Sequence, residues 1–550
     1  MKKEIKLRLL PGEAADDKAI KRAVSQQTGK SISSVTGYHI LKRSIDARAK
    51  TTWINLTLNA FIDEPFHQRE IQPFDFKDVR HAKKRVVIIG AGPAGLFAAL
   101  QLIELGIKPI IIERGKDVRA RRRDLAALNK EGEVNPESNY CFGEGGAGTY
   151  SDGKLYTRSN KRGDINRILN LFVRFGAEEK ILYEAHPHIG TNKLPQIIVA
   201  MREQIIASGA DFYFEKKLVD LETKGNEIFA VTTSDGDIIK ADAFILATGH
   251  SARDIFGLLH KKNILIEGKP FALGVRIEHP QSLIDNIQYV HGTNVNSEYH
   301  RPDALPPASY ALVQQVGGYG VFSFCMCPGG IIAPASTAPG EIVVNGWSPS
   351  KRNNQFANSG MVVQVGEKEV RSEKLQVGNG RPRQRLQTLS AAGIIDNYKN
   401  PLSFMKFQSS VEQKCFEAGG GKMVAPAQRM VDFCEGKFSS SLPDCSYLPG
   451  LRSNKLNEVL PDFVYRSLAN AFREFGKKMK GYFTNDAVVV ATESRTSSPV
   501  RIPRDRESLA HPQYINLYPC GEGAGYAGGI VSAAMDGERV ATVLHKQVNG

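Results

Sequence analysis

Residues 85–113 carry the pattern that most restricts how this chain can fold. A short apolar run at 86–89 is followed by Gly90, Gly92 and Gly95, by an apolar stretch that reaches residue 105, and by a second apolar run at 109–112. This order predicts a buried strand, a tight turn, a helix and a second, parallel strand. Gly90 permits the turn, Gly92 leaves room for an approaching ligand, and Gly95 lets the helix pack closely on the sheet. The segment therefore predicts an α/β fold built on a parallel sheet.

The same turn has the properties of a phosphate-binding site. Pro93 and Ala94 begin the predicted helix, whose free N–H groups and dipole favour a negative charge. Glu113 ends the second strand eighteen residues after Gly95, a spacing at which a carboxylate reaches a ribose 2′-hydroxyl. We expect Glu113 and its neighbour Arg114 to contact the adenosine part of a dinucleotide. NAD and FAD both fit this half of the pattern, and an unrelated glycine-rich loop is the alternative.

A second glycine-rich segment near the end of the sequence separates these two cofactors. Residues 515–518 predict a strand that runs into Gly521 and Glu522, and the stretch from Gly528 to residue 543 predicts a helix. Another predicted strand, 243–247, ends in a small-residue turn. Two such halves in this order predict FAD rather than NAD. The remaining residues that we expect to contact FAD are Gly145, Gly146, Thr248, Gly249, Gly529 and Ile530.

These two halves resemble the glutathione-reductase and para-hydroxybenzoate-hydroxylase type of flavoprotein. The resemblance implies that Glu522 bonds the ribityl chain of FAD, at a position where most of those families have Asp. It also implies that the final helix points its N-terminus at the flavin, where a positive helix end stabilises the anionic reduced ring. The β-rich runs at 211–221, 227–234 and 237–244 predict the β-meander that such proteins contain.

Five further strings are similar to a family of FAD-dependent dehydrogenases described as NAD(FAD)-utilising. They are CFGEGGAGTYSDGKL (141–155), AHPHIGT (185–191), FALGVRIE (271–278), FSFCMCPGG (322–330) and ESRTSSP (493–499). The resemblance implies an FAD-dependent dehydrogenase or reductase that transfers a hydride at flavin N5 on a small organic substrate, with NAD(P)H as a candidate electron donor. An RNA-associated flavoprotein that assists tRNA modification is the alternative. A flavin-binding protein without catalytic use is a third hypothesis.

The rest of the sequence divides around the predicted FAD-binding parts. Residues 1–80 predict a small β-α-β-β module that ends in a proline-containing linker. The FAD-binding domain is expected to be discontinuous, over 82–160, 195–255 and 485–550. The stretch 256–484 is too long for a loop and predicts an inserted α+β substrate domain. The expected fold class is therefore α/β: a discontinuous Rossmann-like FAD domain with a β-meander, an inserted α+β domain and the N-terminal module.

Few side chains suggest chemistry beside the flavin. Cys325 and Cys327 point to the same face of a predicted strand and are candidates for a redox pair or a thiol acid, while two buried thiols without a role are the alternative. His188 is a candidate proton donor or a structural histidine. The two imidazoles at 186 and 188 lack further ligands at metal spacing, and we predict no metal site. Arg276 and Arg495 are candidates either to bind an anionic substrate group or to form structural ion pairs.

Composition limits the remaining possibilities. The seven cysteines in 550 residues indicate a reducing compartment rather than a disulfide framework, and the absence of a signal-like or membrane-spanning stretch predicts a cytoplasmic protein. The formal net charge of +14 leaves an acidic partner such as nucleic acid open, although no nucleic-acid motif accompanies it. The basic run at 119–123 is expected to be either a solvated helix start or a phosphate contact.

Overall fold

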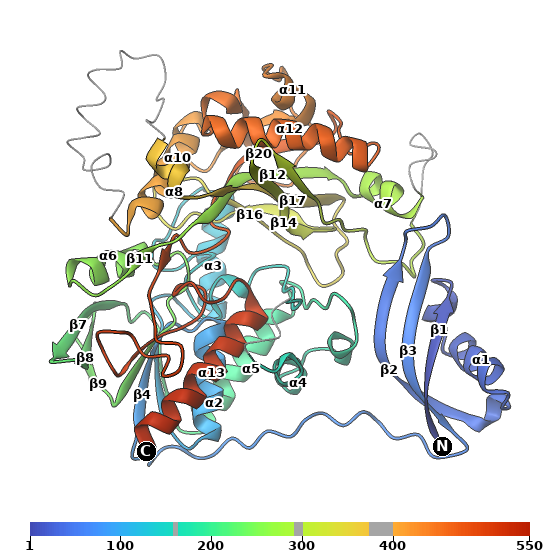
Figure 1. The fold of residues 1–550 in the computed structure, drawn as a ribbon, viewed down its shortest axis with the longest axis horizontal. Helices are drawn as coiled ribbons and strands as arrows, with labels where there is room; N and C mark the ends of the chain where they lie inside the picture. The colour runs from blue at the N-terminus through green and yellow to red at the C-terminus, as the bar shows by residue number, and fades with distance from the viewer. Residues whose placement is uncertain (158–162, 291–300, 373–399, 550) are drawn as a thin grey trace.

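The computed structural model describes residues 1–157, 163–290, 301–372 and 400–549. Figure 1 shows three parts: a lower part around a parallel sheet, an upper part around a second sheet, and a small N-terminal sheet beside them. An extended segment runs along the bottom of the molecule and joins the N-terminal sheet to the lower part. This arrangement confirms the predicted α/β fold class with a parallel sheet.

The lower part is built on a five-stranded sheet in which neighbouring strands are parallel. Its apolar runs are buried on both faces, which is typical of a parallel sheet covered on two sides. The carboxyl ends of the strands all face the upper part, and the loops that follow them meet there. In sheet order the strands are β22 (Leu517–Pro519), β10 (Ala243–Leu246), β4 (Arg85–Ile89), β5 (Lys108–Ile112) and β6 (Asp211–Tyr213).

Helices cover one face of this sheet, and a β-meander covers the other. The helices α2 and α13 pack so closely that a Cβ on Gly537 would lie 2.1 Å from the carbonyl oxygen of Ala94. The helices on this face are α2 (Pro93–Glu104), α4 (Ile165–Arg174), α5 (Leu194–Ala207) and α13 (Ile530–Asn549). The opposite face carries β7 (Leu218–Lys224), β8 (Glu227–Thr233), β9 (Ile238–Lys240) and α6 (Arg253–Lys261).

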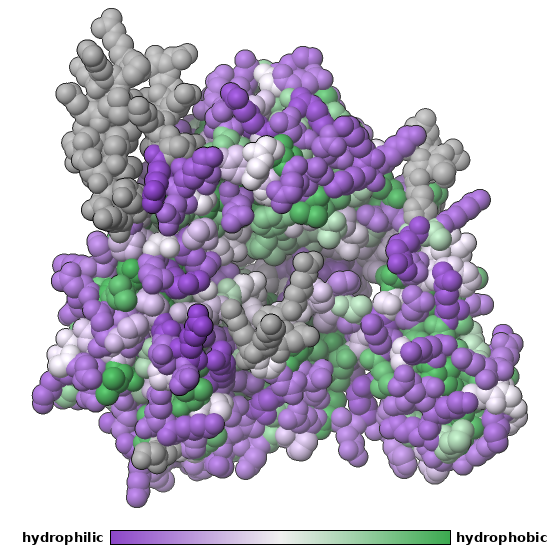
Figure 2. All heavy atoms as spheres, viewed as in Figure 1, coloured by the Kyte–Doolittle hydropathy of each residue, from purple (hydrophilic) through white to green (hydrophobic). Residues whose placement is uncertain are grey.

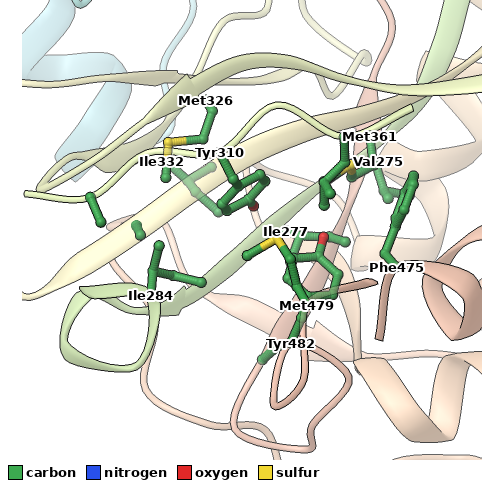
Figure 3. Packing of buried hydrophobic residues seen from close by; sticks show 14 of the residues in the cluster. Val275, Ile277, Ile284, Tyr310, Met326, Ile332, Met361, Phe475, Met479 and Tyr482 are labelled. Atoms are coloured by element: carbon green, nitrogen blue, oxygen red, sulfur yellow. The ribbon is translucent and has the colours of Figure 1, made fainter. Parts of the chain in front are cut away.

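The upper part contains a seven-stranded, largely antiparallel sheet beneath a layer of helices (Figure 1). Figure 3 shows the apolar core between them, where Val275 and Ile277 of one strand meet Phe475, Met479 and Tyr482. In sheet order the strands are β13 (Val313–Val316), β14 (Tyr319–Cys327), β17 (Phe356–Val365), β12 (Phe271–Pro280), β20 (Val488–Glu493), β18 (Ala425–Arg429) and β19 (Leu451–Ser453). The helices of this part are α7 (Gln281–Tyr289), α8 (Glu367–Ser372), α10 (Ser403–Gly419), α11 (Met430–Glu435) and α12 (Asp462–Lys478).

The N-terminal part is a three-stranded antiparallel sheet with one helix, α1 (Asp17–Thr28). Its strands, in the order β1 (Lys2–Leu9), β3 (Trp53–Ile62) and β2 (Val35–Asp46), follow the predicted β-α-β-β order. The free edge of β2 pairs with the body of the protein, because Arg43 N–H donates to the Tyr183 carbonyl (2.8 Å) and Ala185 N–H donates to the Arg43 carbonyl (2.9 Å). The remaining short elements are α3 (Val118–Lys130), β11 (Glu267–Gly268), β15 (Ile331–Pro334), β16 (Val344–Trp347) and β21 (Val500–Arg501).

Several expected elements differ from those observed. The run 211–221 was expected to belong to the meander, but it splits into β6 of the parallel sheet and β7 of the meander. The run 237–244 was expected to be one strand, but it splits into β9 of the meander and β10 of the parallel sheet. Asp242 lies between these two strands, and its carboxylate accepts a hydrogen bond from Arg85 N–H at 2.8 Å. The last helix begins at Ile530 rather than Gly528. The domain limits given above remain a prediction.

Candidate functional site

A long pocket lies where the lower and upper parts meet. Its lower wall consists of the loops that follow β4, β5, β10 and β22, together with the start of α13. Its upper wall comes from β14 and β16 and includes Phe324, Cys325, Cys327 and Asn345. The predicted cofactor-binding residues that line the pocket are Gly90, Gly92, Pro93, Ala94, Glu113, Arg114, Gly146, Thr248, Gly249, Gly521, Glu522, Gly528, Gly529 and Ile530. Gly95 and Gly145 lie behind the wall and are not part of its lining.

The glycines of the first turn have different surroundings. A Cβ on Gly95 would lie 2.0 Å from the carbonyl oxygen of Gly90, so this position must stay bare for the helix to pack on the turn. A Cβ on Gly92 would meet only the Cα of Gly146, at 3.9 Å, and would otherwise point into open space. Gly92 therefore leaves room for a ligand rather than for the protein itself.

The Glu113 carboxylate holds the glycine-rich loops together. Its Oε2 accepts from Ala91 N–H at 2.8 Å, and its Oε1 accepts from Gly115 and Gly143 N–H, both at 2.9 Å. The side chain is only 5% exposed, yet it lines the pocket. A carboxylate oxygen has room for two hydrogen bonds, so Oε2 can still accept one from a ribose hydroxyl.

Arg121 has a role that the basic run at 119–123 did not suggest. Its guanidinium is fully buried and donates to the carbonyl oxygens of Asn139, Tyr140, Glu144 and Gly146 at 2.8–2.9 Å, and to Thr149 Oγ1 at 3.2 Å. It is therefore neither a solvated residue nor a surface phosphate contact. The guanidinium fixes the loop that places Gly146 against the glycine turn, and it adds a buried positive charge behind this loop.

Glu522 is the acidic residue of the lower wall in the loop that follows β22. Burial raises the pKa of its carboxyl to about 7, and nearby Lys269 counteracts this only in part. Thr248 Oγ1, also in the pocket wall, is buried and has no hydrogen-bond partner among the described residues. A buried polar atom without a partner costs free energy, which a bound ligand with hydroxyl groups would recover.

In the upper wall, β14 is irregular at the two cysteines. Its pairing with β17 shifts between Phe324 and Cys327, and Cys325 has a φ of 46°, a strained conformation for a residue with a side chain. Met326 points into the apolar core (Figure 3), while Cys325 and Cys327 line the pocket. The Cys325 side chain is exposed toward the pocket, and its partial removal from bulk water raises the pKa of its thiol to about 11, so it remains protonated at neutral pH. Cys327 Sγ lies 3.5 Å from an Arg276 nitrogen and 3.9 Å from Lys154 Nζ.

Lys154 lines the pocket beside the two cysteines, a position that the sequence did not predict. The backbone at Lys154 pairs with that at His188, because Leu155 N–H donates to the Pro187 carbonyl at 2.9 Å. The ammonium group of Lys154 donates to the Met326 carbonyl. Asp152 lies 3.7 Å away, but it accepts at 2.6 Å from Arg352. The string 141–155 contained these residues, but only folding brings them next to β14.

The other candidate side chains are bonded to groups of the protein, and their roles in chemistry remain a prediction. His188 is outside the pocket lining, Nε2 lies 3.2 Å from the Ser350 carbonyl, and burial together with Arg352 lowers the pKa of its imidazole to about 4. Arg276 is fully buried against Glu493 at 2.7 Å. Arg495 reaches the pocket, but its guanidinium pairs with Glu341 and Glu412, both at 3.0 Å. Both arginines therefore form the structural ion pairs that were the alternative to substrate binding.

Comparisons with known proteins agree with this geometry. A family model described as "FAD-dependent protein, C-terminal domain-like" matches residues 270–496, an "FAD binding domain" model matches 83–125, and a domain of unknown function matches 1–61. An uncharacterized protein of Clostridium beijerinckii is 37% identical over 544 residues, which cover 96% of this chain and 95% of the relative. This chain belongs to the family of FAD-dependent proteins.

The solved structures that are similar to this FAD-dependent protein are distant. CtdE in complex with FAD is 9% identical, with coverage of 85% of this chain and 88% of that chain and a TM-score of 0.30. The flavin-dependent brominase Bmp2 is 12% identical, with coverage of 85% and 80% and a TM-score of 0.34. The RNA-associated alternative finds no support in these comparisons.

FAD fits the pocket of this FAD-dependent protein. One wall of the pocket contains Gly92 with open space above it, Glu113 with a spare acceptor, the unpartnered Thr248 hydroxyl and the Glu522 carboxylate.

Among the described residues, no cluster of His, Cys, Asp and Glu could hold a metal ion. No described helix is long and apolar enough to cross a membrane, and the face shown in Figure 2 is largely hydrophilic.

Proposed function

We propose that this FAD-dependent protein is an oxidoreductase that transfers a hydride between flavin N5 and a small organic substrate, with NAD(P)H as a transient electron donor. The observation that carries the proposal is the composition of the pocket. Its lower wall has the features of a dinucleotide site, and its upper wall brings a protonated thiol, Cys325, and an ammonium, Lys154, to the same space. These two groups support a site that binds a substrate beside the flavin.

The cofactor contacts follow from the lower wall. The start of α2 and the glycine turn would hold the pyrophosphate, whose charge is also balanced by Arg121 behind the loop. Glu113 would accept from the adenosine ribose, and Glu522 from the ribityl chain. The start of α13 would lie near the pyrimidine edge of the flavin, where the helix dipole favours negative charge.

The side chains of the upper wall would orient the substrate. FAD supplies hydride transfer at N5 when it is bound. Cys325 retains its proton at neutral pH and would hold it next to the substrate, because its thiol has a pKa of about 11. The seven-stranded sheet would exclude water from this side of the ring. Residues 256–484 would then form the substrate domain.

Anaerobic mixing with NADH and with NADPH tests the proposal. The yellow colour of the purified protein is expected to bleach with at least one of them, and mass analysis of the released cofactor is expected to give FAD. A protein that releases only FMN or NAD contradicts the cofactor assignment. If the protein retains FAD but neither nucleotide reduces it, the assignment of NAD(P)H as electron donor is wrong. The protein would then be a dehydrogenase whose flavin is reduced by the organic substrate.

A further inference from the structure

The charged residues that line the pocket differ in how their charges are balanced. Arg114 has carboxylate oxygens of Glu137 and Asp254 within 2.9 Å, and Lys217 contacts the same two residues at 2.9 and 3.2 Å. The other paired cations of the lining are Lys216, which contacts Asp235 and Asp237, and Arg495, which contacts Glu341 and Glu412. Lys154 is the exception within the described part of the chain, because its one ion pair, with Asp152, spans 3.7 Å.

The partner of Lys154 is already engaged elsewhere. Asp152 is only 3% exposed and accepts two hydrogen bonds from Arg352, at 2.6 and 3.3 Å. The negative charge of Asp152 is therefore shared between Arg352, which it contacts directly, and the more distant Lys154. The remaining contacts of the ammonium are the Met326 carbonyl and, at 3.9 Å, the Cys327 sulfur. These are weak partners for a charge that is partly removed from water.

The ammonium is nevertheless charged and reachable from the pocket. Burial opposes its protonation, but the surrounding groups, among them the Asp152 carboxylate, favour it and raise the pKa of Lys154 above its ordinary value. About a third of the side chain (35%) is exposed, and it is exposed toward the pocket that it lines. Tyr156 and Phe324 line the pocket near it and provide flat apolar surface for an organic group.

We infer that the substrate is an organic anion, a carboxylate being the simplest case, and that Lys154 is its counter-ion. The inference rests on the proposed function, since it places the substrate on the upper side of the flavin. The anion would bind the ammonium beside the Cys325 thiol, with its organic part between Tyr156, Phe324 and the ring. Arg276 and Arg495 do not compete for it, because their guanidinium groups are already bound to carboxylates.

The test uses the purified holoenzyme and two matched pairs of probes. Benzoate and acetate are titrated against the uncharged benzamide and acetamide, and the change in flavin absorbance reports binding. The carboxylates are expected to bind ~10–100-fold more tightly than the amides, which is the effect of one charge-assisted hydrogen bond. Carboxylates that fail to bind, or that bind no better than the amides, overturn the inference.

Variants identify the residue responsible. Lys154→Met is expected to abolish the preference for carboxylates, and Lys154→Arg to retain part of it. Lys437→Met removes the same charge from a side chain that is 69% exposed and paired with Glu435, and it is expected to leave the preference unchanged. A preference that survives in Lys154→Met assigns the anion to another residue and contradicts the inference. FAD content is measured first in each protein, because a chain without FAD contradicts the proposed function itself, whereas a flavoprotein without anion preference contradicts only this inference.

Discussion

The lower and upper walls of the pocket are built from different kinds of structure. The lower wall consists of short loops at the ends of buried parallel strands, and its geometry is fixed by backbone N–H groups that bond Glu113 and by carbonyls that bond Arg121. The upper wall lies within a long antiparallel strand whose pairing slips at Cys325, and its cation Lys154 lacks a close carboxylate. A lower wall whose loops are fixed by many hydrogen bonds suits a cofactor that stays bound, and an upper wall whose ammonium lacks a close carboxylate suits a substrate that binds and leaves.

Replacing Arg121 by Met breaks the lower wall most severely. The change leaves several buried carbonyl oxygens without a donor, and each such group costs about 1–3 kcal/mol, so we expect the free energy of unfolding to fall by at least ~3 kcal/mol and FAD to be lost. Urea unfolding and the flavin content after purification measure both effects. Arg122→Met is the matched control, because this neighbour is exposed, and its stability is expected to change by no more than about 0.5 kcal/mol. Equal behaviour of the two variants would contradict the role of Arg121.

Two glycines of the first turn serve different purposes, because Gly95 is required for packing and Gly92 leaves space for the ligand. Gly95→Ala forces a Cβ against the Gly90 carbonyl and is expected to reduce both stability and FAD binding. Gly92→Ala meets no tight contact, so the stability of the FAD-free protein is expected to stay within about 1 kcal/mol while FAD binding is lost. Thermal unfolding with and without added FAD distinguishes the two. If Gly92→Ala binds FAD normally, the pyrophosphate does not lie over this turn.

The protonation of Glu522 gives the lower wall a pH dependence. Its folded pKa of about 7 lies above the ordinary value of 4.5, so the folded protein binds the proton more tightly than the unfolded chain. The stability of the FAD-free protein is therefore expected to fall as pH rises from about 4.5 to 7, by ~1–3 kcal/mol more than in Glu522→Gln. Glu538, whose pKa burial also raises to about 7, is present in both proteins and cancels in the comparison. Parallel stability curves for the two proteins would show that Glu522 is ionised throughout.

Changes to the two thiols are expected to have the smallest effect on FAD retention. The double variant Cys325→Ser and Cys327→Ser keeps the lower wall intact, and we expect FAD affinity to change less than about threefold. The flavin absorbance spectrum and the rate of reduction are expected to change, because both side chains line the pocket. An unaltered spectrum together with an unaltered rate would remove the pair from the mechanism, and a loss of FAD would show that the two walls are not independent.

Much of the lower wall could be predicted from sequence, because its signals are local. The strand, the glycine turn, the helix and the acidic residue follow one another between Arg85 and Glu113. The signals of the second glycine-rich segment, around Glu522, are equally close together in the sequence. The contacts of Arg121 and Lys154 could not be predicted in this way. Lys154 meets Met326 at a separation of 172 residues, and Arg121 has the same residue type as its exposed neighbours Arg122 and Arg123. Which arginine of a basic run turns inward depends on the fold around it.

The segment 183–190 links the N-terminal sheet to the part of the body that carries Lys154. At one end it is hydrogen-bonded to Arg43 at the edge of β2, and at the other it is hydrogen-bonded to the chain around Lys154, where Ile189 N–H donates to the Gly153 carbonyl at 3.1 Å. Deleting the N-terminal sheet would leave the Tyr183 carbonyl and the Ala185 N–H without these partners. Shortened versions of this protein made for crystallisation or assay should therefore be compared with the full chain before their kinetics are taken to describe it.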